Sequence, residues 1–462
     1  MVFWHESGIV QLLIIAALLL VAAGIRRIVH RWRDIVMPDS MVAGVIGLLL
    51  GPSLLALLPL DTDFLEKVVY HALAIVFIAI GLQTPARGKA TGNAKSMAIG
   101  IPLLAMLQGA VGLLVVLVWA SLRGSPVFPG FGLMTPLAFS QGPGQALSLG
   151  KAWESMGMAD GGQIGLIMAA IGFGWCALVG VPLISWARKR GWTEDQGRDP
   201  AKPTDAEAKA GQSLRELRLP PPGGMEPLSL QLVSIGAIYL ITWVILWAAG
   251  NALAEKPQLV ALLFGFHFII SGILALVFRR LLDRTPVPNR LHDGLLGRIA
   301  GTTVDVGTCA AFCAIQIQVL KANALPILVT TSVAGFATLM VCIWAAKRAF
   351  PSHPFEHAIV LFGCSTGTMP TGLALLRVLD PELKGPVATS AVLGATAAII
   401  FGAPLLLVVI PAATAGFPGS FPGPVFLALG MIAVWSVVLV VLLRFAAPFR
   451  PLRPLTDLWP RS

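Results

Sequence analysis

The chain has 462 residues, of which 56% are hydrophobic and only 12% are charged. Ordinary globular proteins carry about 25% charged residues, so this composition excludes a soluble protein and predicts a polytopic membrane protein. The formal net charge of +10 does not indicate a nucleic-acid partner, because the basic residues lie in short segments between apolar runs and instead report membrane topology.

Five long apolar runs and one broken stretch make up the first part of the chain. A helix that crosses a membrane needs about 20 apolar residues. The runs lie at residues 8–25, 40–58, 67–84, 97–120 and 162–187. The broken stretch, residues 131–160, precedes the last run. No Lys or Arg precedes the first run and four arginines follow it, which predicts a retained first span with its N-terminus outside.

The second half repeats this order in the opposite orientation. Residues 188–227 form a polar, Pro-rich linker that we expect in the cytoplasm. Apolar runs follow at residues 228–249, 258–278, 299–320, 324–346 and 389–413, with a broken stretch at 358–388. The loop charges place the start of this half inside. We therefore predict inverted repeats, with the first hairpin entering from outside and the second from the cytoplasm.

A final apolar run, residues 424–443, has no counterpart in the first half. Arg444, Arg450 and Arg453 follow it, which places the C-terminus in the cytoplasm. The sequence thus predicts an all-α integral membrane protein in four parts. These are a first repeat at 1–187, the linker at 188–227, a second repeat at 228–413, and an extra span with a basic tail at 414–462.

The two broken stretches are the candidate binding site. Gly and Pro interrupt helices, and a membrane tolerates an interrupted backbone only where protein or a watery cavity satisfies its N–H and C=O groups. A shift of 222 residues matches four Gly and Pro positions of the two segments, which favours two copies of one unit. The matches are Gly150 with Gly372, Gly172 with Gly394, Gly180 with Gly402, and Pro182 with Pro404.

The tips of the two hairpins carry small and polar residues. Carbonyl and hydroxyl oxygens suit Na⁺, and free N–H groups at the starts of half-helices suit a carboxylate. The candidate substrate-binding residues are Ser140, Gln141, Gly142, Gly144, Gln145, Ser365, Thr366, Gly367, Thr368, Thr371 and Arg377. The candidate sodium ligands are Asp305, Thr366 and Thr368. The alternative is that Gly, Ser and Thr only let helices pack closely.

Two charged residues, Asp305 and Arg377, have two interpretations each, and Lys151 has one. An ionised Asp305 facing lipid would cost about 2.5–3.5 kcal/mol, so we expect it to face the bundle interior, either in cation coupling or as a packing partner. Arg377 could hold a carboxylate or pair with Asp380 or Glu382. Lys151 lies three residues before Glu154 and is expected to pair with it.

The remaining chemistry-bearing residues do not indicate an enzyme. The five cysteines lie in apolar or hairpin segments and are expected to be free and buried. His71 and His267 are expected to be hydrogen-bonded packing residues. Gly363 to Gly367 spell the G-x-S-x-G pattern of a hydrolase nucleophile, but no His follows His357 to act as its base. We expect no cofactor other than Na⁺ as coupling ion.

Several segments resemble the sodium/glutamate symporter family. Residues 37–44 (MPDSMVAG) resemble the proline-acid start of that family's second span, and residues 77–82 (FIAIGL) its third. Residues 369–373 (MPTGL) are similar to its second hairpin. This chain departs from the family pattern in the first hairpin, which lacks a His, at Arg377, and in the extra span.

The resemblance implies a fold, a mechanism and a location. It implies two inverted five-helix repeats with re-entrant hairpins meeting at a Na⁺ and substrate site. It also implies an elevator-type homodimer, in which a transport domain moves against a scaffold, in the bacterial inner membrane. The function it implies is Na⁺-coupled symport of glutamate or a related small carboxylate.

Two other functions remain open. One is transport of di- or tricarboxylates or other organic anions, or Na⁺/H⁺ exchange, by a similar architecture. The other is a non-transporting membrane sensor or a membrane enzyme.

Overall fold

The computed structural model describes residues 7–28, 37–84, 91–193, 225–285, 291–380, 383, 385–447 and 449–454. Regular structure in these ranges is helical, and no strand occurs in them. Nine of the described helices are long and apolar enough to cross a membrane, and a pair bent by 55° would make a tenth. The prediction of an all-α, multi-pass membrane protein is therefore confirmed at this level.

The helices of the first half follow the predicted runs closely. They are α1 (Ser7–Ile28), α2 (Asp39–Leu50), α3 (Thr62–Gly81), α4 (Gly92–Arg123), α5 (Gly130–Pro136), η3 (Leu137–Gln141), α6 (Pro143–Glu154), α7 (Gly161–Trp175), η4 (Cys176–Gly180) and α8 (Val181–Lys189). The segments labelled η are wider, π-type turns. One span is shorter than predicted: α2 ends at Gly51 because Pro52 has no N–H and cannot continue the helix.

The second half ends in a long helix, α19, at the position of the final apolar run. Its elements are α10 (Pro227–Ala252), α11 (Pro257–Gly265), α12 (His267–Leu282), α13 (Asp293–Cys313), α14 (Ile317–Ala322), α15 (Ala324–Ala349), α16 (Pro354–Leu376), α17 (Pro386–Pro404), η5 (Leu405–Val409), α18 (Ile410–Thr414) and α19 (Gly423–Ala446). The bent pair is α11 and α12, which meet at Phe266. Most of the predicted linker lies outside the described residues.

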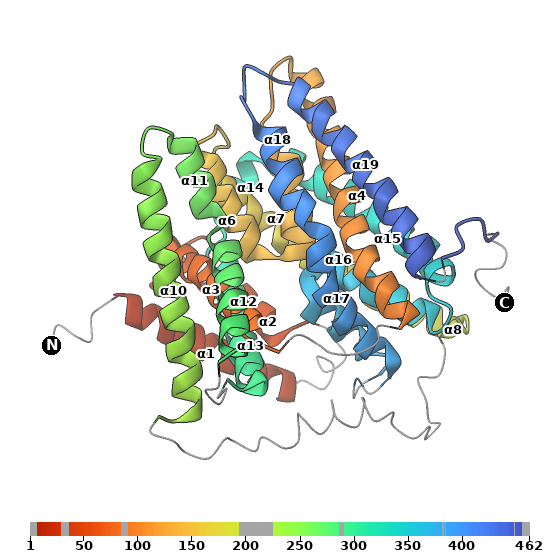
Figure 1. The fold of residues 1–462 in the computed structure, drawn as a ribbon, viewed down its shortest axis with the longest axis horizontal. Helices are drawn as coiled ribbons and strands as arrows, with labels where there is room; N and C mark the ends of the chain where they lie inside the picture. The colour runs from red at the N-terminus through yellow and green to blue at the C-terminus, as the bar shows by residue number, and fades with distance from the viewer. Residues whose placement is uncertain are drawn as a thin grey trace.

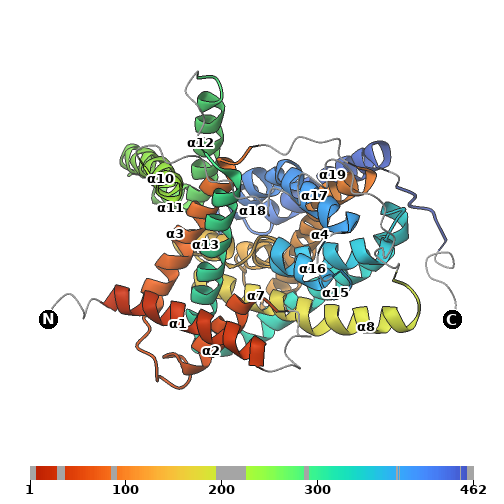
Figure 2. The ribbon, with the colours of Figure 1, turned by 90° about the horizontal axis from the view of Figure 1, so that it is seen from below.

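The helices form two groups in the views of Figures 1 and 2. Helices α1, α2, α3, α10, α12 and α13 lie on the side of the N-terminus, and α4, α15, α16, α17 and α19 on the side of the C-terminus. In the first group α13 packs along both α2 and α3, and α12 packs along α3. In the second group α4 packs against α15, α17 and α19. The first hairpin contacts both groups, because α6 packs against α3 and α13 and α5 packs against α4, whereas the second hairpin, α16, belongs to the second group.

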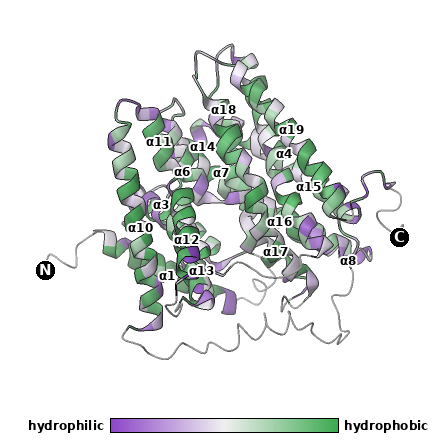
Figure 3. Cartoon of the chain, viewed as in Figure 1, coloured by the Kyte–Doolittle hydropathy of each residue, from purple (hydrophilic) through white to green (hydrophobic). Residues whose placement is uncertain are grey.

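The outer helices are apolar along most of their length. Figure 3 shows hydrophobic residues along α10 and α19. Large side chains on α10, among them Leu240, Trp243 and Trp247, are exposed in the single chain. Such faces would be costly in water and are expected against lipid or another protein.

The first hairpin reverses the chain at Gly142. Helix α5 and turn η3 lead to this glycine, whose φ of +93° lies in a region that favours glycine. Helix α6 then runs back, so that a Cβ added at Gly130 would lie 2.7 Å from the ring of Trp153. A second close approach, between Gly112 of α4 and Gly132 of α5, packs the hairpin against the bundle.

The second hairpin is formed within α16. Its length and composition would let it cross a membrane, but Gly367 and Thr368 have non-helical backbone angles. Gly363 and Gly372 would be about 13.5 Å apart along a straight helix. Instead, a Cβ added at Gly363 would lie 2.7 Å from the Cα of Gly372. The chain therefore turns back on itself at Gly367 and Thr368.

The reversal within α16 predicts an unusual response to a small substitution. Alanine normally stabilises a helix interior relative to glycine by about 0.5–1 kcal/mol. At Gly363 the added methyl group meets backbone, so Gly363→Ala is expected to destabilise the fold by about 1–3 kcal/mol. The matched control is Gly236→Ala in α10, where nothing lies within 4 Å. Thermal unfolding in detergent measures both, and an equal midpoint for the two variants would contradict the hairpin.

Candidate binding site at the hairpin tips

The tips of the two hairpins meet. A Cβ added at Gly142 would lie 2.7 Å from Cγ2 of Thr368, so the two turns are in direct contact. These two residues are 226 positions apart. The shift of 222 matched in the sequence therefore misplaces the tips by about one helical turn. Two segments that the sequence identified separately thus form one locus.

A glutamine of α4 joins the tips, and the sequence analysis did not select it. The side chain of Gln108 is fully buried. Its Nε2 donates to the carbonyl oxygen of Ser365 at 2.7 Å and to Oγ1 of Thr338 at 3.0 Å. Ser140 Oγ donates to Gln108 Oε1 at 3.1 Å. Gln108 thus connects both hairpins with α15. The sequence indicates its importance only by placing an amide side chain within a long apolar run.

Several oxygen atoms at the tips are buried without a hydrogen-bond partner among the described residues. They are Oγ of Ser365 and Oε1 of Gln141 and of Gln145. An unsatisfied buried oxygen typically costs about 1–3 kcal/mol, so such atoms usually have a partner such as water, an ion or a ligand. All three atoms are the hard oxygen ligands that Na⁺ requires.

The helix N-termini at the tips offer backbone N–H donors, in contrast to the oxygen acceptors described above. Helix α6 begins directly after Gly142, with Pro143 in its first turn. The backbone N–H groups of Gly144 and Gln145 have no acceptor within the helix, and the helix dipole makes this end electropositive. The returning arm of the second hairpin likewise begins at the contact. Both half-helices therefore present positive ends at one locus, which suits an anion.

The remaining candidates of the second hairpin fall into two sets. Thr366 and Thr371 are buried near the tip, where their hydroxyls donate to the carbonyl oxygens of Phe362 and Gly367. Their lone pairs remain available to a cation. Arg377, in contrast, is exposed at the end of α16 that is distant from the tip. The structure does not bring Arg377 to the tips.

Asp305 lies on the exposed side of α13, which differs from the expectation that it faces the bundle interior. The opposite side of α13 is occupied by contacts with α2 and α3. This leaves Gly301, Thr302 and Asp305 exposed in the single chain. Periodicity could not predict this, because it gives the spacing of a helix face but not which neighbour covers it.

A second polar cluster joins the hairpin to the first helix group. Lys151 Nζ lies 2.8 Å from Glu66 and 3.5 Å from Glu154. The predicted pair is therefore present, but the shorter contact is to Glu66. Gln163 of α7 donates to Glu66 at 2.7 Å and accepts from the N–H of Gln316 at 2.9 Å.

This cluster also affects the titration of Lys151. Partial burial lowers the pKa of Lys151, but its hydrogen bonds and charge interactions with Glu66 and Glu154 raise it more, so the net pKa shift is upward.

The cysteines and the two histidines of the predicted spans, His71 and His267, can be compared with the expectations for them. All five cysteines are free and buried, as predicted. His267 is buried and its two nitrogens lie 3.0 Å from the carbonyl oxygens of Tyr70 and Phe264. Nδ1 of His71 lies 2.5 Å from the hydroxyl of Tyr239. Both histidines are therefore hydrogen-bonded, as expected, but only His267 is buried, since His71 is exposed.

The sequence was compared with known protein families and with curated proteins. No protein-family model and no curated protein matches the chain.

The role of Gln108 predicts a loss of stability on its replacement. Gln108→Leu keeps a similar volume but leaves the Ser365 carbonyl and the Ser140 hydroxyl without their buried partner, so we expect a loss of about 1–3 kcal/mol. The matched control is Gln258→Leu on α11, where the side chain is exposed. Unfolding midpoints in detergent compare the two, and equal stability would mean that Gln108 does not hold the tips together.

Proposed function

We propose that the protein is a secondary active transporter that couples Na⁺ entry to the import of a small carboxylate, with glutamate as the first candidate. The observation that carries the proposal is the direct contact of two broken helices at Gly142 and Thr368. A pump or symporter needs a site that can be closed from either side, and two hairpins meeting at one point supply two barriers. Oxygen atoms for Na⁺ and N–H groups for a carboxylate occur at that same contact.

Reciprocal packing supports an origin in two inverted repeats. Helix α2 approaches α13 closely at Gly44, where an added Cβ would lie 2.5 Å from Phe312. Helix α3 approaches α12 in the same way at Gly81, 2.8 Å from Ala275. If α2 corresponds to α12 and α3 to α13, these are the two related contacts that a pseudo-twofold axis produces. The pair α4 and α15, joined by Gln108 and Thr338, would lie across that axis.

The roles at the tips follow from their chemistry. Ser365 Oγ, the glutamine oxygens and the Thr366 and Thr368 hydroxyls are the proposed sodium ligands. The N–H groups at the start of α6 would receive the substrate carboxylate. Arg377 takes no part in this arrangement. The homodimer and the elevator-type motion are part of the proposal and rest on the family resemblance.

Uptake in proteoliposomes tests the proposal. Purified protein is expected to accumulate labelled glutamate when an inward Na⁺ gradient is imposed and not when K⁺ replaces Na⁺. Na⁺-independent binding without uptake would favour a sensor, and uptake of other carboxylates alone would replace glutamate as the substrate.

Two glycine variants connect uptake with the tips. Gly144→Val would press on Leu73 of α3, which lies 3.2 Å from the added Cβ, and Gly367→Val would press on Phe173 at 3.0 Å. We expect both to abolish uptake with little loss of membrane yield. Gly174→Val, in α7 with open space around it, is the control and should transport normally. Normal uptake by both tip variants would place the site elsewhere.

Asp305→Asn tests the remaining candidate for coupling. The substitution removes a charge at nearly constant volume. Because Asp305 is exposed and away from the buried side of α13, a coupling role requires that it meets the tips in another conformation. In that case the Na⁺ concentration for half-maximal uptake should rise, with expression unchanged. An unchanged Na⁺ dependence would remove Asp305 from the site.

A further inference from the structure

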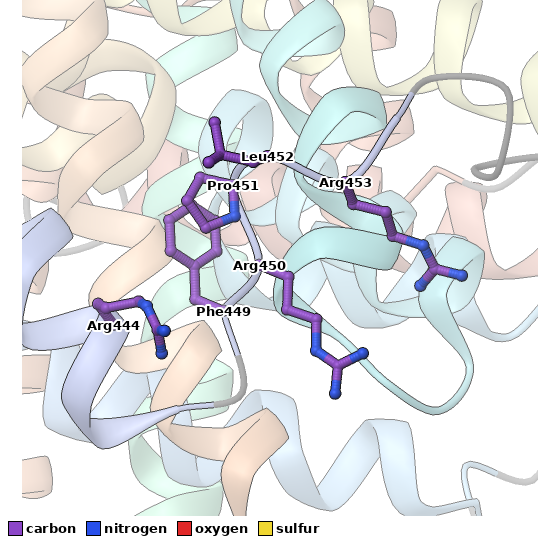
Figure 4. A pocket seen from close by; sticks show the side chains of 6 residues that line it. All are labelled: Arg444, Phe449, Arg450, Pro451, Leu452 and Arg453. Atoms are coloured by element: carbon purple, nitrogen blue, oxygen red, sulfur yellow. The ribbon is translucent and has the colours of Figure 1, made fainter.

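A basic pocket lies where the chain leaves α19, the span without a counterpart in the first half. Its volume is about 500 Å³. The lining residues are Arg444, Phe449, Arg450, Pro451, Leu452 and Arg453. In the view of Figure 4, Arg444 and Arg450 extend on either side of Phe449.

The pocket is held in shape by Arg348 at the end of α15. The Arg348 side chain donates from Nε to the carbonyl oxygen of Pro451 at 3.1 Å and from Nη2 to that of Arg453 at 2.5 Å. Its backbone carbonyl accepts the N–H of Arg450 at 2.8 Å. Phe449 is 4% exposed and its ring lies edge-on to Trp344. The tail is therefore folded onto α15, and the Arg453 guanidinium also donates to the carbonyl oxygen of Lys347 at 3.3 Å.

The charges in the pocket have one sign. It is lined by three arginines and by no acidic side chain. Within the described part of the chain, no ion pair engages Arg444, Arg450 or Arg453. Like charges that line one pocket repel one another, and a bound anion would reduce that repulsion. Arginine forks match the oxygens of phosphate in particular.

The surroundings of the pocket are apolar and exposed. Leu452 is 93% exposed and Phe445, next to Arg444, is 86% exposed. The side of α19 leading to the pocket also exposes Val437 and Val441. A ligand that satisfies both the arginines and this apolar face must itself have a charged and an apolar part.

We propose that this pocket binds the phosphate headgroup of an anionic phospholipid, with its acyl chains along α19. The lipid would join the end of α19 to the end of α15 through the folded tail. The proposal does not depend on what the protein transports.

Thermal unfolding of the full chain in detergent tests the proposal. Added phosphatidylglycerol should raise the midpoint of wild-type protein more than phosphatidylcholine does. In the variant Arg444→Gln/Arg450→Gln/Arg453→Gln the apparent affinity for phosphatidylglycerol should fall on the order of 100-fold, because each basic residue contributes to binding an anionic lipid. The guanidinium of Arg450 makes no described hydrogen bond, so the single variant Arg450→Gln should fold normally. It should lower the apparent affinity for phosphatidylglycerol on the order of fivefold, and it tests the proposal if the triple variant does not fold.

A second triple variant controls for charge alone. Arg280→Gln/Arg284→Gln/Arg298→Gln removes the same charge from exposed positions elsewhere and should respond as wild type does. The proposal is overturned if this control loses the response equally or if the pocket variants keep it. It is also overturned if phosphatidylcholine acts equally, or if inorganic phosphate at the same concentration gives the same rise, which would indicate a free-anion site.

Discussion

The contact between two interrupted helices is the constraint on which the centre of this molecule depends. An interrupted helix leaves backbone groups without partners, and a membrane offers no water to replace them. Here the carbonyl oxygen of Ser365 accepts a hydrogen bond from Nε2 of Gln108. Oε1 of Gln108 in turn accepts a hydrogen bond from the hydroxyl of Ser140. Glycine at the first tip lets the second approach without a Cβ between them. The two tips must therefore be in contact and have their polar groups hydrogen-bonded at the same time.

The same contact includes buried oxygen atoms without a described partner. The hydrogen bonds around Gln108 use the backbone carbonyl of Ser365, and its hydroxyl oxygen is left over. The oxygens of Gln141 and Gln145 are likewise buried and unused within the described chain. The side chains of Glu66, Lys151 and Gln163 are paired with one another. Other buried polar atoms away from the tips, such as Oδ1 of Asn93 and Nε1 of Trp153, also have no partner among the described residues. The three tip oxygens differ from these in belonging to the two broken helices that meet, which is why the proposed site is placed there.

Local signals in the sequence predicted the hairpins, because Gly and Pro act on their own segment of backbone. The breaks at Gly142 and at Gly367 and Thr368 follow from such signals. The burial of the cysteines follows instead from the apolar segments in which they lie. Gln108 was not predicted as a site residue, because its hydrogen-bond partners, Thr338 and Ser365, are more than 200 residues away in the sequence. The exposure of Asp305 was not predicted either, since the helices that cover one side of α13 are distant in sequence.

Labelling of the tips by a thiol reagent tests most directly whether they form one ligand site. Ser140 and Thr368 are half-buried at the contact, and the native cysteines are buried and should react slowly. With Ser140→Cys or Thr368→Cys, Na⁺ and glutamate together should slow modification several-fold, and neither Na⁺ nor glutamate alone should match this effect. Unchanged modification rates at both positions, in protein that still takes up glutamate, would contradict the account.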